Sequence, residues 1–415
     1  MTDTFLKFPD GFLWGSATSS HQIEGGTHND WSEWEHSPRR LEQLRREGKD
    51  PQEYVSGRAC DSYRRYEEDF DIARELKHTS HRFSLEWSRI EPEEGKFDHE
   101  QMAHYVQVAD ALRERGMEPM VTLWHFTNPA WFSRKGGFLH PDSPRLFERY
   151  VRYVVGNLKG RVNLWITFNE ALTVYATLAY LRGAWPPQKR DLWAFRRFQK
   201  QIIEAHTLAY RVIKNAFRQW PPLGEASEDN TSHNVTVGIV ENVRHIVAGR
   251  FLEKTGLASL VRWFFYDRLF KRLTSYTDFW GLNYYTIRRL PGSFGVLPKQ
   301  PEVPEMNWEI YPEGMYRVLM RLKKFGKPIY VTENGISDAS DERREQFIGE
   351  HLSWIRRAVE EGVDVRGYFH WSLLDSFEWH RGFGPRFGLV EVDYRTLKRT
   401  IRPSARAYAT MIQGT

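Results

Sequence analysis

The sequence predicts an α/β protein in which a single (β/α)8 TIM barrel spans residues 1–415. Short apolar runs rich in β-branched and aromatic residues recur along the chain, and long amphipathic stretches separate them. This alternation indicates a parallel sheet with helices on its outer face. Eight such units favour closure into a barrel. An open doubly wound sheet would carry a Gly-rich phosphate turn after its first strand, and the sequence has none there.

Each expected strand is a short apolar run that is suited to burial on both faces of a sheet. The expected strands cover residues 12–19, 79–87, 118–126, 162–169, 234–241, 278–285, 328–333 and 366–374. The carboxyl ends of all eight strands should meet at one face of the barrel, which is the face where TIM barrels have their functional sites.

The expected helices are the amphipathic stretches 61–77, 99–115, 144–158, 194–217 and 343–361. Asp61 is expected to cap the first of these with its side chain, and Gly116, Gly326 and Gly362 should end others. Residues 249–277 form a helical, aromatic-rich insertion before the sixth strand, which we do not interpret as a domain of its own.

Composition and charge exclude several classes of protein. The 59 Lys and Arg residues are nearly balanced by 54 Asp and Glu residues and are dispersed along the chain, so we expect no nucleic-acid partner. Cys60 is the only cysteine, and the histidine pairs His78/His81 and His99/His104 lack partners at ligand spacing, so neither a disulfide nor a metal site is expected. We expect no organic cofactor.

The N-terminus lacks the apolar core of a signal peptide, and no apolar run is long enough to span a bilayer. We therefore expect a cytoplasmic protein without a membrane partner.

Two expected strands end on a glutamate, in Trp-Ile-Thr-Phe-Asn-Glu at 165–170 and Tyr-Val-Thr-Glu-Asn-Gly at 330–335. Paired carboxylates at one rim are what a retaining glycoside hydrolase requires. The other strand ends carry amides, an imidazole, indoles and further carboxylates. This mixture suits a hydroxyl-rich ligand, since each hydroxyl both donates and accepts a hydrogen bond.

Five motifs in the same order resemble glycoside hydrolase family 1, from about Phe5 to about Tyr408. They are Gly11–Gly15 with Gln22-Ile23-Glu24-Gly25, Arg82-Phe83-Ser84-Leu85-Glu86-Trp87-Ser88-Arg89-Ile90, Thr-Phe-Asn-Glu at 167–170, Thr-Glu-Asn-Gly at 332–335, and Trp371-Ser372-Leu373-Leu374-Asp375-Ser376-Phe377-Glu378-Trp379. One tetrapeptide alone would be weak evidence, but the ordered set at strand ends is specific.

The resemblance implies a role for each matched residue. Glu170 corresponds to the acid/base and Glu333 to the nucleophile, with Arg82, Tyr285 and the neighbouring Asn283 supporting the nucleophile. The remaining matches imply contacts with the sugar at the cleaved end: Gln22, His125, Asn169, Trp371, Glu378 and Trp379. Glu24, Glu86, Trp87 and Trp124 are interpreted as structural.

The resemblance implies a catalytic domain acting on a small β-glycoside or oligosaccharide. The leading hypothesis is a retaining, exo-acting β-glycosidase for unphosphorylated glucosides, galactosides or fucosides. Two alternatives stay open: a 6-phospho-β-glycosidase, for which Arg381 and Arg386 are candidate phosphate ligands, and a non-catalytic carbohydrate-binding member of the family. The sequence also departs from the family at Phe126, Ser376 and His380-Arg381, and the stretch between Asn283 and Glu333 is compact.

Overall fold

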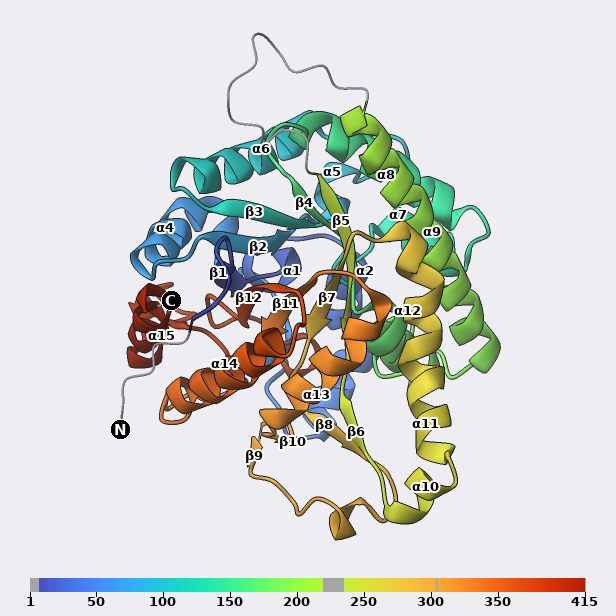
Figure 1. Ribbon diagram of the computed structural model, residues 1–415. Helices are drawn as coiled ribbons and strands as arrows, with labels where there is room; N and C mark the ends of the chain where they lie inside the picture. The colour runs from blue at the N-terminus through green and yellow to red at the C-terminus, as the bar shows by residue number, and fades with distance from the viewer. Residues whose placement is uncertain (1–6, 219–234, 304, 415) are drawn as a thin grey trace.

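A computed structural model describes residues 7–218, 235–303 and 305–414 and contains the predicted closed, parallel eight-stranded barrel (Figure 1). Neighbouring strands follow the order β1-β12-β11-β7-β5-β4-β3-β2. The strands are β1 (Leu13–Ala17), β2 (Ser80–Ser84), β3 (Glu118–Thr122), β4 (Leu164–Asn169), β5 (Thr236–Asn242), β7 (Phe279–Asn283), β11 (Ile329–Asn334) and β12 (Val365–Trp371).

Each of the eight predicted runs overlaps one barrel strand; some strands end earlier than predicted, and β5, β11 and β12 each extend one residue beyond the predicted run. Thus β3 ends at Thr122, and the apolar run continues as a loop through Phe126, whose φ of 74° is incompatible with an extended strand. Residue 234, the first of the fifth predicted run, lies outside the described residues.

The outer layer contains the five predicted helices, and the chain forms further helices there and in the loops between strands and helices (Figure 1). The predicted helices are α4 (Ser62–Glu75), α6 (His99–Glu114), α8 (Ser143–Leu158), α9 (Leu192–Arg218) and α14 (Arg344–Glu360). The others are α1 (Ser20–Ile23), α2 (Asp30–Glu35), α3 (Pro38–Arg46), α5 (Trp87–Ile90), α7 (Ala130–Arg134), α13 (Glu313–Leu322), α15 (Pro403–Gln413) and the π-helix η3 (Ala171–Leu181).

One predicted cap is wrong in its chemistry. Asp61 does precede α4, but its side chain makes no capping hydrogen bond, because its backbone is left-handed, with φ of 54°. The predicted helix ends at Gly116, Gly326 and Gly362 are confirmed, and all three glycines have positive φ, as a left-handed C-terminal turn requires.

The segment before β7 is helical, as predicted. It contains α10 (Arg250–Lys254), α11 (Leu257–Arg262), the π-helix η5 (Trp263–Asp267) and α12 (Arg268–Leu273), which run along one side of the barrel beyond α9 (Figure 1). Short strand pairs lie outside the barrel. They are β6 (His245–Val247) with β8 (Ile287–Arg289), β9 (Glu302–Val303) with β10 (Trp308–Glu309), and β13 (Val390–Val392) with β14 (Arg399–Ile401).

The two strands that lead to the glutamates are both irregular near their carboxyl ends. The register of β4 against β5 shifts between Ile166 and Asn169, and that of β11 against β7 shifts between Val331 and Glu333. An extra residue in one strand of a pair bends that strand and re-aims its side chains. These shifts therefore affect which side chains face the rim of the barrel.

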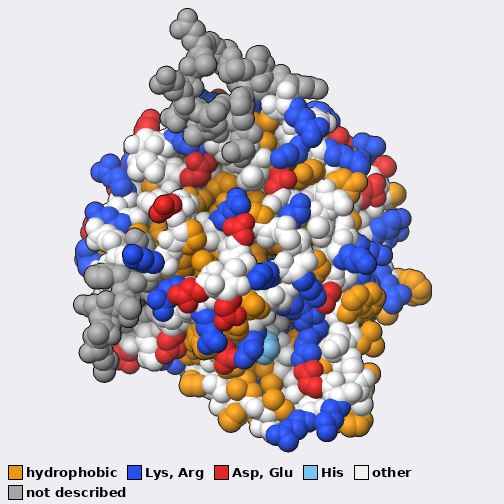
Figure 2. All heavy atoms as spheres, viewed as in Figure 1, with side chains coloured by type: hydrophobic (Ala, Val, Ile, Leu, Met, Phe, Trp, Pro, Cys, Tyr) orange, Lys and Arg blue, Asp and Glu red, His pale blue; other side chains and the backbone are white. Residues whose placement is uncertain are grey.

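The surface mixes charges of both signs. Basic and acidic side chains are interspersed over most of the face seen in Figure 2, and hydrophobic side chains gather at its lower end, where α10 and the loop after β8 lie in Figure 1. Exposed Phe251 and Phe294 belong to these two segments. No helix within the described part of the chain has both the length and the apolar character needed to cross a membrane.

Candidate active site

A cavity of about 360 Å³ opens at the carboxyl ends of the barrel strands. Eight of the eleven side chains singled out from the sequence line it: His125, Asn169, Glu170, Tyr285, Glu333, Trp371, Glu378 and Trp379. The other three, Gln22, Arg82 and Asn283, are fully buried directly behind this lining. The barrel thus brings together, at one rim, residues that lie more than 350 positions apart in the chain.

Glu333, at the end of β11, is held by a cation and a phenol. Arg82 Nη1 donates to Glu333 Oε1 at 2.6 Å, and the Tyr285 hydroxyl donates to Glu333 Oε2 at 2.7 Å. Both partners stabilise the ionised carboxylate. Each carboxylate oxygen has one fixed partner, so the group is oriented as well as charged.

Glu170 lies in a different electrostatic environment. Its Oε1 accepts hydrogen bonds from Asn283 Nδ2 at 2.7 Å and Asn242 Nδ2 at 3.1 Å, and no cation within the described residues forms an ion pair with it. Burial, reinforced by the negative charge of Glu333, raises the pKa of Glu170 to about 8. A carboxyl group with this pKa carries a proton at neutral pH.

Asn283 was expected beside the nucleophile but contacts the other carboxylate. Its Nδ2 donates to Glu170, and also to Asn169 Oδ1 at 3.1 Å, while its Oδ1 accepts from Thr332 Oγ1 at 2.7 Å. The Asn283 amide therefore orients Glu170, and it is linked to the Glu333 carboxylate only indirectly, through Asn169 and Arg82. The sequence placed Asn283 at the correct rim, but it did not indicate which carboxylate its amide would reach.

The Asn169 amide links Arg82 to His125. Asn169 Oδ1 accepts from Arg82 Nη2 at 2.7 Å, which leaves Asn169 Nδ2 to donate to His125 Nε2 at 3.1 Å. Burial and the nearby Arg82 charge lower the pKa of His125 well below its usual range, so the ring is neutral. Because Nε2 accepts, the proton lies on Nδ1, which has no partner among the described residues. His125 can therefore donate a hydrogen bond to a ligand hydroxyl.

Glu378 is oriented through one of its two oxygens. Gln22 Nε2, Trp371 Nε1 and Ser376 Oγ all donate to Glu378 Oε1, at 3.3, 3.3 and 3.2 Å. No described residue donates to Oε2, which is therefore available to a ligand. Burial raises the pKa of Glu378 to about 8. Gln22 thus lies behind Glu378 and positions it, rather than lining the cavity itself.

The aromatic walls of the cavity are ordered around His125. The His125 ring lies between Trp371 and Trp379, with centroid distances of 5.9 Å to each and interplanar angles of 26° and 16°. Trp379 and Phe126 both have positive φ, and both line the cavity. Strained backbone at a ligand site is stable only where the surrounding packing enforces it.

Sequence reasoning missed two residues that act on Glu170. Asn242 ends β5 and donates directly to Glu170, although the predicted fifth strand stopped one residue before it. Glu241 accepts hydrogen bonds from the Leu172 and Thr173 backbone N–H groups, both at 3.0 Å, and so fixes the start of η3 directly after Glu170. A search for polar residues at every strand end would have found Asn242.

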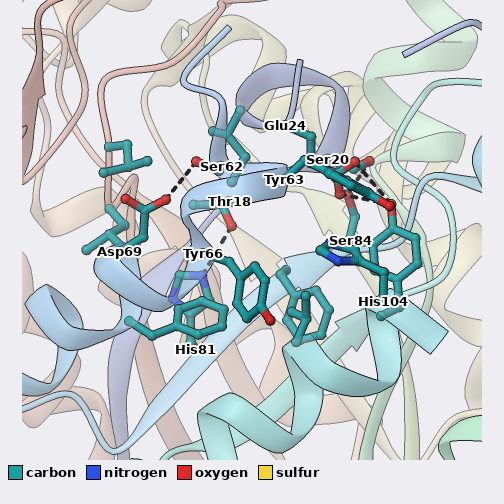
Figure 3. A pocket seen from close by; sticks show the side chains of 17 residues that line it. Thr18, Ser20, Glu24, Ser62, Tyr63, Tyr66, Asp69, His81, Ser84 and His104 are labelled. Atoms are coloured by element: carbon teal, nitrogen blue, oxygen red, sulfur yellow. Dashed lines mark hydrogen bonds between the residues drawn. The ribbon is translucent and has the colours of Figure 1, made fainter. Parts of the chain in front are cut away.

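A second cavity, of about 40 Å³, lies between the barrel wall and helices α4 and α6 (Figure 3). Several of its polar groups already have partners: Ser62 donates to Asp69 at 2.7 Å, and Thr18 and His81 are 3.2 Å apart. Glu24 is paired with Arg89 at 2.8 Å. With so little room, this cavity can hold a buried water but not a sugar.

Comparisons with known proteins agree on one family. The sequence profile described as glycosyl hydrolase family 1 matches residues 5–415. β-Glucosidase A of Thermotoga maritima is 31% identical over an alignment covering 98% of each chain, and a β-galactosidase of Pyrococcus woesei is 29% identical over 95% of this chain and 94% of its own.

A solved structure gives the same result at the level of the fold. A β-glycosidase from Pyrococcus horikoshii has 36% sequence identity and a TM-score of 0.84, over 99% of this chain and 95% of its own.

Proposed function

The chain belongs to glycosyl hydrolase family 1 and is a β-glycosidase, and on this premise we propose that it acts by a retaining, exo-acting mechanism on unphosphorylated β-linked glucosides, galactosides or fucosides. The observation that carries the proposal is the contrast between two buried carboxyl groups at one rim. Glu333 is bound by Arg82 and Tyr285, and Glu170 is bound only by amides.

The first step is glycosylation of the enzyme. Glu170, protonated at neutral pH, donates its proton to the glycosidic oxygen while Glu333 attacks the anomeric carbon. The bond to the leaving group breaks, and a covalent ester forms between the sugar and Glu333. The negative charge of Glu333 is lost in this ester, which reduces the force that holds the proton on Glu170.

The second step reverses these roles. Glu170, now ionised, removes a proton from water, whose oxygen attacks the anomeric carbon and releases Glu333. Two inversions at one carbon give net retention. This mechanism requires carboxyl groups about 5–5.5 Å apart, whereas a separation above about 6.5 Å would indicate inversion.

The walls on the sugar side favour one terminal sugar with free hydroxyls. His125 Nδ1 offers a donor, Glu378 Oε2 offers an acceptor when ionised, and Trp371 and Trp379 offer flat faces. Glu378, held from behind by Gln22, can accept from a 4-hydroxyl in either orientation, so both glucosides and galactosides fit the proposal.

The 6-phospho alternative finds less support. Arg386 donates to Asp375 Oδ2 at 3.3 Å and to the Val392 carbonyl at 3.0 Å, and does not line the cavity. Arg381 lines the cavity but donates to the backbone carbonyls of residues 305 and 306. Both guanidinium groups already have acceptors within the protein.

Turnover of a panel of nitrophenyl β-glycosides tests the proposal and separates a catalyst from a binding protein. We expect Glu333→Ala to reduce kcat by about 10⁴-fold or more, because the covalent intermediate cannot form. Azide should restore turnover and yield a glycosyl azide of inverted configuration. Activity retained in Glu333→Ala would contradict the nucleophile assignment.

A further inference from the structure

A groove continues from the active-site cavity past Glu170. It has a volume of about 320 Å³ and shares five lining residues with that cavity: Val174, Leu178, Arg182, Asn242 and Arg244. The rest of its wall comes from η3, α9, η5, α12 and β8. The groove is therefore continuous with the site rather than separate from it.

The groove lies on the leaving-group side of the scissile bond. Asn242, shared by both cavities, donates to Glu170, the proposed proton donor to the glycosidic oxygen. The sugar contacts formed by His125, Glu378 and Trp379 line the other cavity only. A leaving group bonded to that oxygen would extend past Glu170 into the groove.

All of the charged side chains that line the groove are positive. Five arginines contribute to its wall, and no Asp or Glu of the described chain does: Arg182, Arg244, Arg268, Arg288 and Arg289. Arg289 is neutralised by Glu309, with contacts of 2.6 and 2.7 Å. The other four form no ion pair with any described residue, and Arg268 donates only to the neutral Gln199, at 3.2 Å.

Burial disfavours the positive charge of Arg244, one of the arginines without an ion pair. Arg244 is partly buried just after β5, where burial lowers its pKa, Tyr266 and Glu170 oppose that shift, and Arg288 and Arg182 add to it. A buried cation is normally paired, because removing it from water without a partner is unfavourable. A groove wall that carries several guanidinium groups and no carboxylate suits an anion.

Aromatic rings beneath two of these arginines add an apolar surface. The Arg288 guanidinium lies 4.5 Å from the centre of the Phe265 ring, and that of Arg268 lies 4.8 Å from the centre of Phe264. Val174 and Leu178 line the groove where it meets the cavity. The groove therefore combines apolar side chains with arginines both where it meets the cavity, at Arg182 and Arg244, and farther out, at Arg268 and Arg288.

We propose that this groove binds the leaving group of anionic β-glycosides, in which an apolar or aromatic portion next to the glycosidic oxygen carries a carboxylate, sulfate or phosphate that contacts Arg244 and Arg288. This inference rests on the proposed function and specifies its substrate class. Arg182 lies near enough to contribute at the exposed edge.

Matched aryl glucosides test the proposal. 4-(Carboxymethyl)phenyl β-glucoside and its neutral analogue, 4-(carbamoylmethyl)phenyl β-glucoside, have phenols of similar acidity, so their kcat/KM ratio reports on the distant charge. We expect about a tenfold preference for the carboxylate at low salt, the size of one charge-assisted contact. A phosphonomethyl analogue distinguishes a preference for phosphate from one for carboxylate. About 0.5 M sodium chloride should reduce either preference.

The substitutions Arg244→Gln and Arg288→Gln, singly and together, should bring the ratio of the two rates towards one. Arg197→Gln is the matched control, since Arg197 is an exposed arginine of α9 outside the groove, and its ratio should equal that of the unmodified enzyme. In case the double variant fails to fold, competition in the unmodified enzyme gives the same information. The phenol 4-hydroxyphenylacetate should inhibit more strongly than 4-hydroxyphenylacetamide, and salt should remove the difference.

The outcomes separate this inference from the proposed function. Equal rates for the charged and neutral glucosides would overturn the anionic groove and leave the β-glycosidase mechanism intact. A preference that survives both substitutions would also overturn it. Failure to hydrolyse any of these glucosides, including a nitrophenyl glucoside, would refute the proposed substrate range and the inference with it.

Discussion

Glu170 and Glu333 are identical side chains whose nearest partners differ in charge. The Arg82 guanidinium and the Tyr285 hydroxyl stabilise a negative charge on Glu333, while two neutral amides leave Glu170 exposed to the field of Glu333. The proton therefore belongs on Glu170 while Glu333 is ionised, and it becomes easier to release when Glu333 is esterified. This coupling gives the two residues their proposed roles.

The first prediction concerns the alkaline limb of the pH–rate profile. The pKa of Glu170 is raised to about 8, so the protonated acid, and with it kcat/KM, should be lost as the pH rises through about 8. In Glu170→Gln this limb should disappear. Hydrolysis of an unactivated alkyl glucoside should fall by about 10²–10⁴-fold, since its leaving group needs a proton. A dinitrophenyl glucoside, whose leaving group needs none, should still glycosylate the enzyme.

Measuring both substrates between pH 5 and pH 10 checks this prediction. Persistence of the limb in Glu170→Gln would assign it to another group, with Glu378 the first candidate because its pKa is also raised to about 8.

Much of the site could be predicted at this scale because its residues belong to motifs that end strands. All eleven selected side chains lie in or directly behind one cavity. The partner of Asn283 could not be predicted, because β7 ends between β5 and β11 and its side chain could turn towards either neighbour. Asn242 was missed because the predicted fifth strand stopped one residue early.

At the scale of elements, strand irregularities decide where the glutamates point. Phe168 packs against Phe147 of α8 with ring centroids 4.5 Å apart, so it faces the helix layer. Regular alternation would turn Glu170 to the same side. Instead, the left-handed backbone of Glu170, with φ of 47°, returns its carboxyl group to the cavity. Hydrophobic periodicity locates β4 but contains no information about this turn.

A second prediction concerns the glycine that follows the nucleophile's strand. A Cβ atom on Gly335 would lie 1.9 Å from the Trp371 carbonyl oxygen, so Gly335→Ala must separate the ends of β11 and β12. We expect a loss of about 1–3 kcal/mol in the free energy of unfolding, together with a lower kcat/KM, because Glu333 and Trp371 both move.

The matched control for this prediction is Gly349→Ala in the middle of α14. Its nearest neighbour would be Met411 Cε, at an ordinary 3.6 Å. Removing a helix-interior glycine should stabilise the protein by up to about 1 kcal/mol and leave kcat/KM unchanged. Chemical denaturation with parallel kinetics measures both; equal stabilities for the two variants would contradict the close contact at Gly335.

At the scale of the whole molecule, buried titratable groups set the dependence of stability on pH. Burial lowers the pKa values of seven histidines to about 3–4: His78, His81, His104, His206, His245, His351 and His380. The unfolded chain binds protons at these positions below about pH 6.5, and the folded protein does not. Their contribution to stability is therefore lost as the pH falls from about 6.5 towards 4.

Buried carboxyl groups act in the opposite direction, and four of them have large pKa shifts. Burial raises the pKa values of Glu170 and Glu378 to about 8, of Glu241 to about 7 and of Asp30 to about 6. The folded protein keeps these protons after the unfolded chain has released its own, so stability falls as the pH rises from about 4.5 to about 8. Among these groups, the seven histidines outnumber the four carboxyl groups below pH 6, and the carboxyl groups dominate above pH 7.

The midpoint temperature of unfolding should therefore be greatest at about pH 6–7 and fall more steeply on the acid side. His104→Phe tests the histidine contribution, because His104 stacks on Tyr63 with centroids 3.8 Å apart and a phenyl ring preserves that contact. In this variant, the free energy of unfolding should change with pH less steeply on the acid side, by the equivalent of up to one bound proton, and should not change in slope above pH 7. A maximum below pH 5 would show that the carboxyl groups, rather than the histidines, control the stability of the folded enzyme.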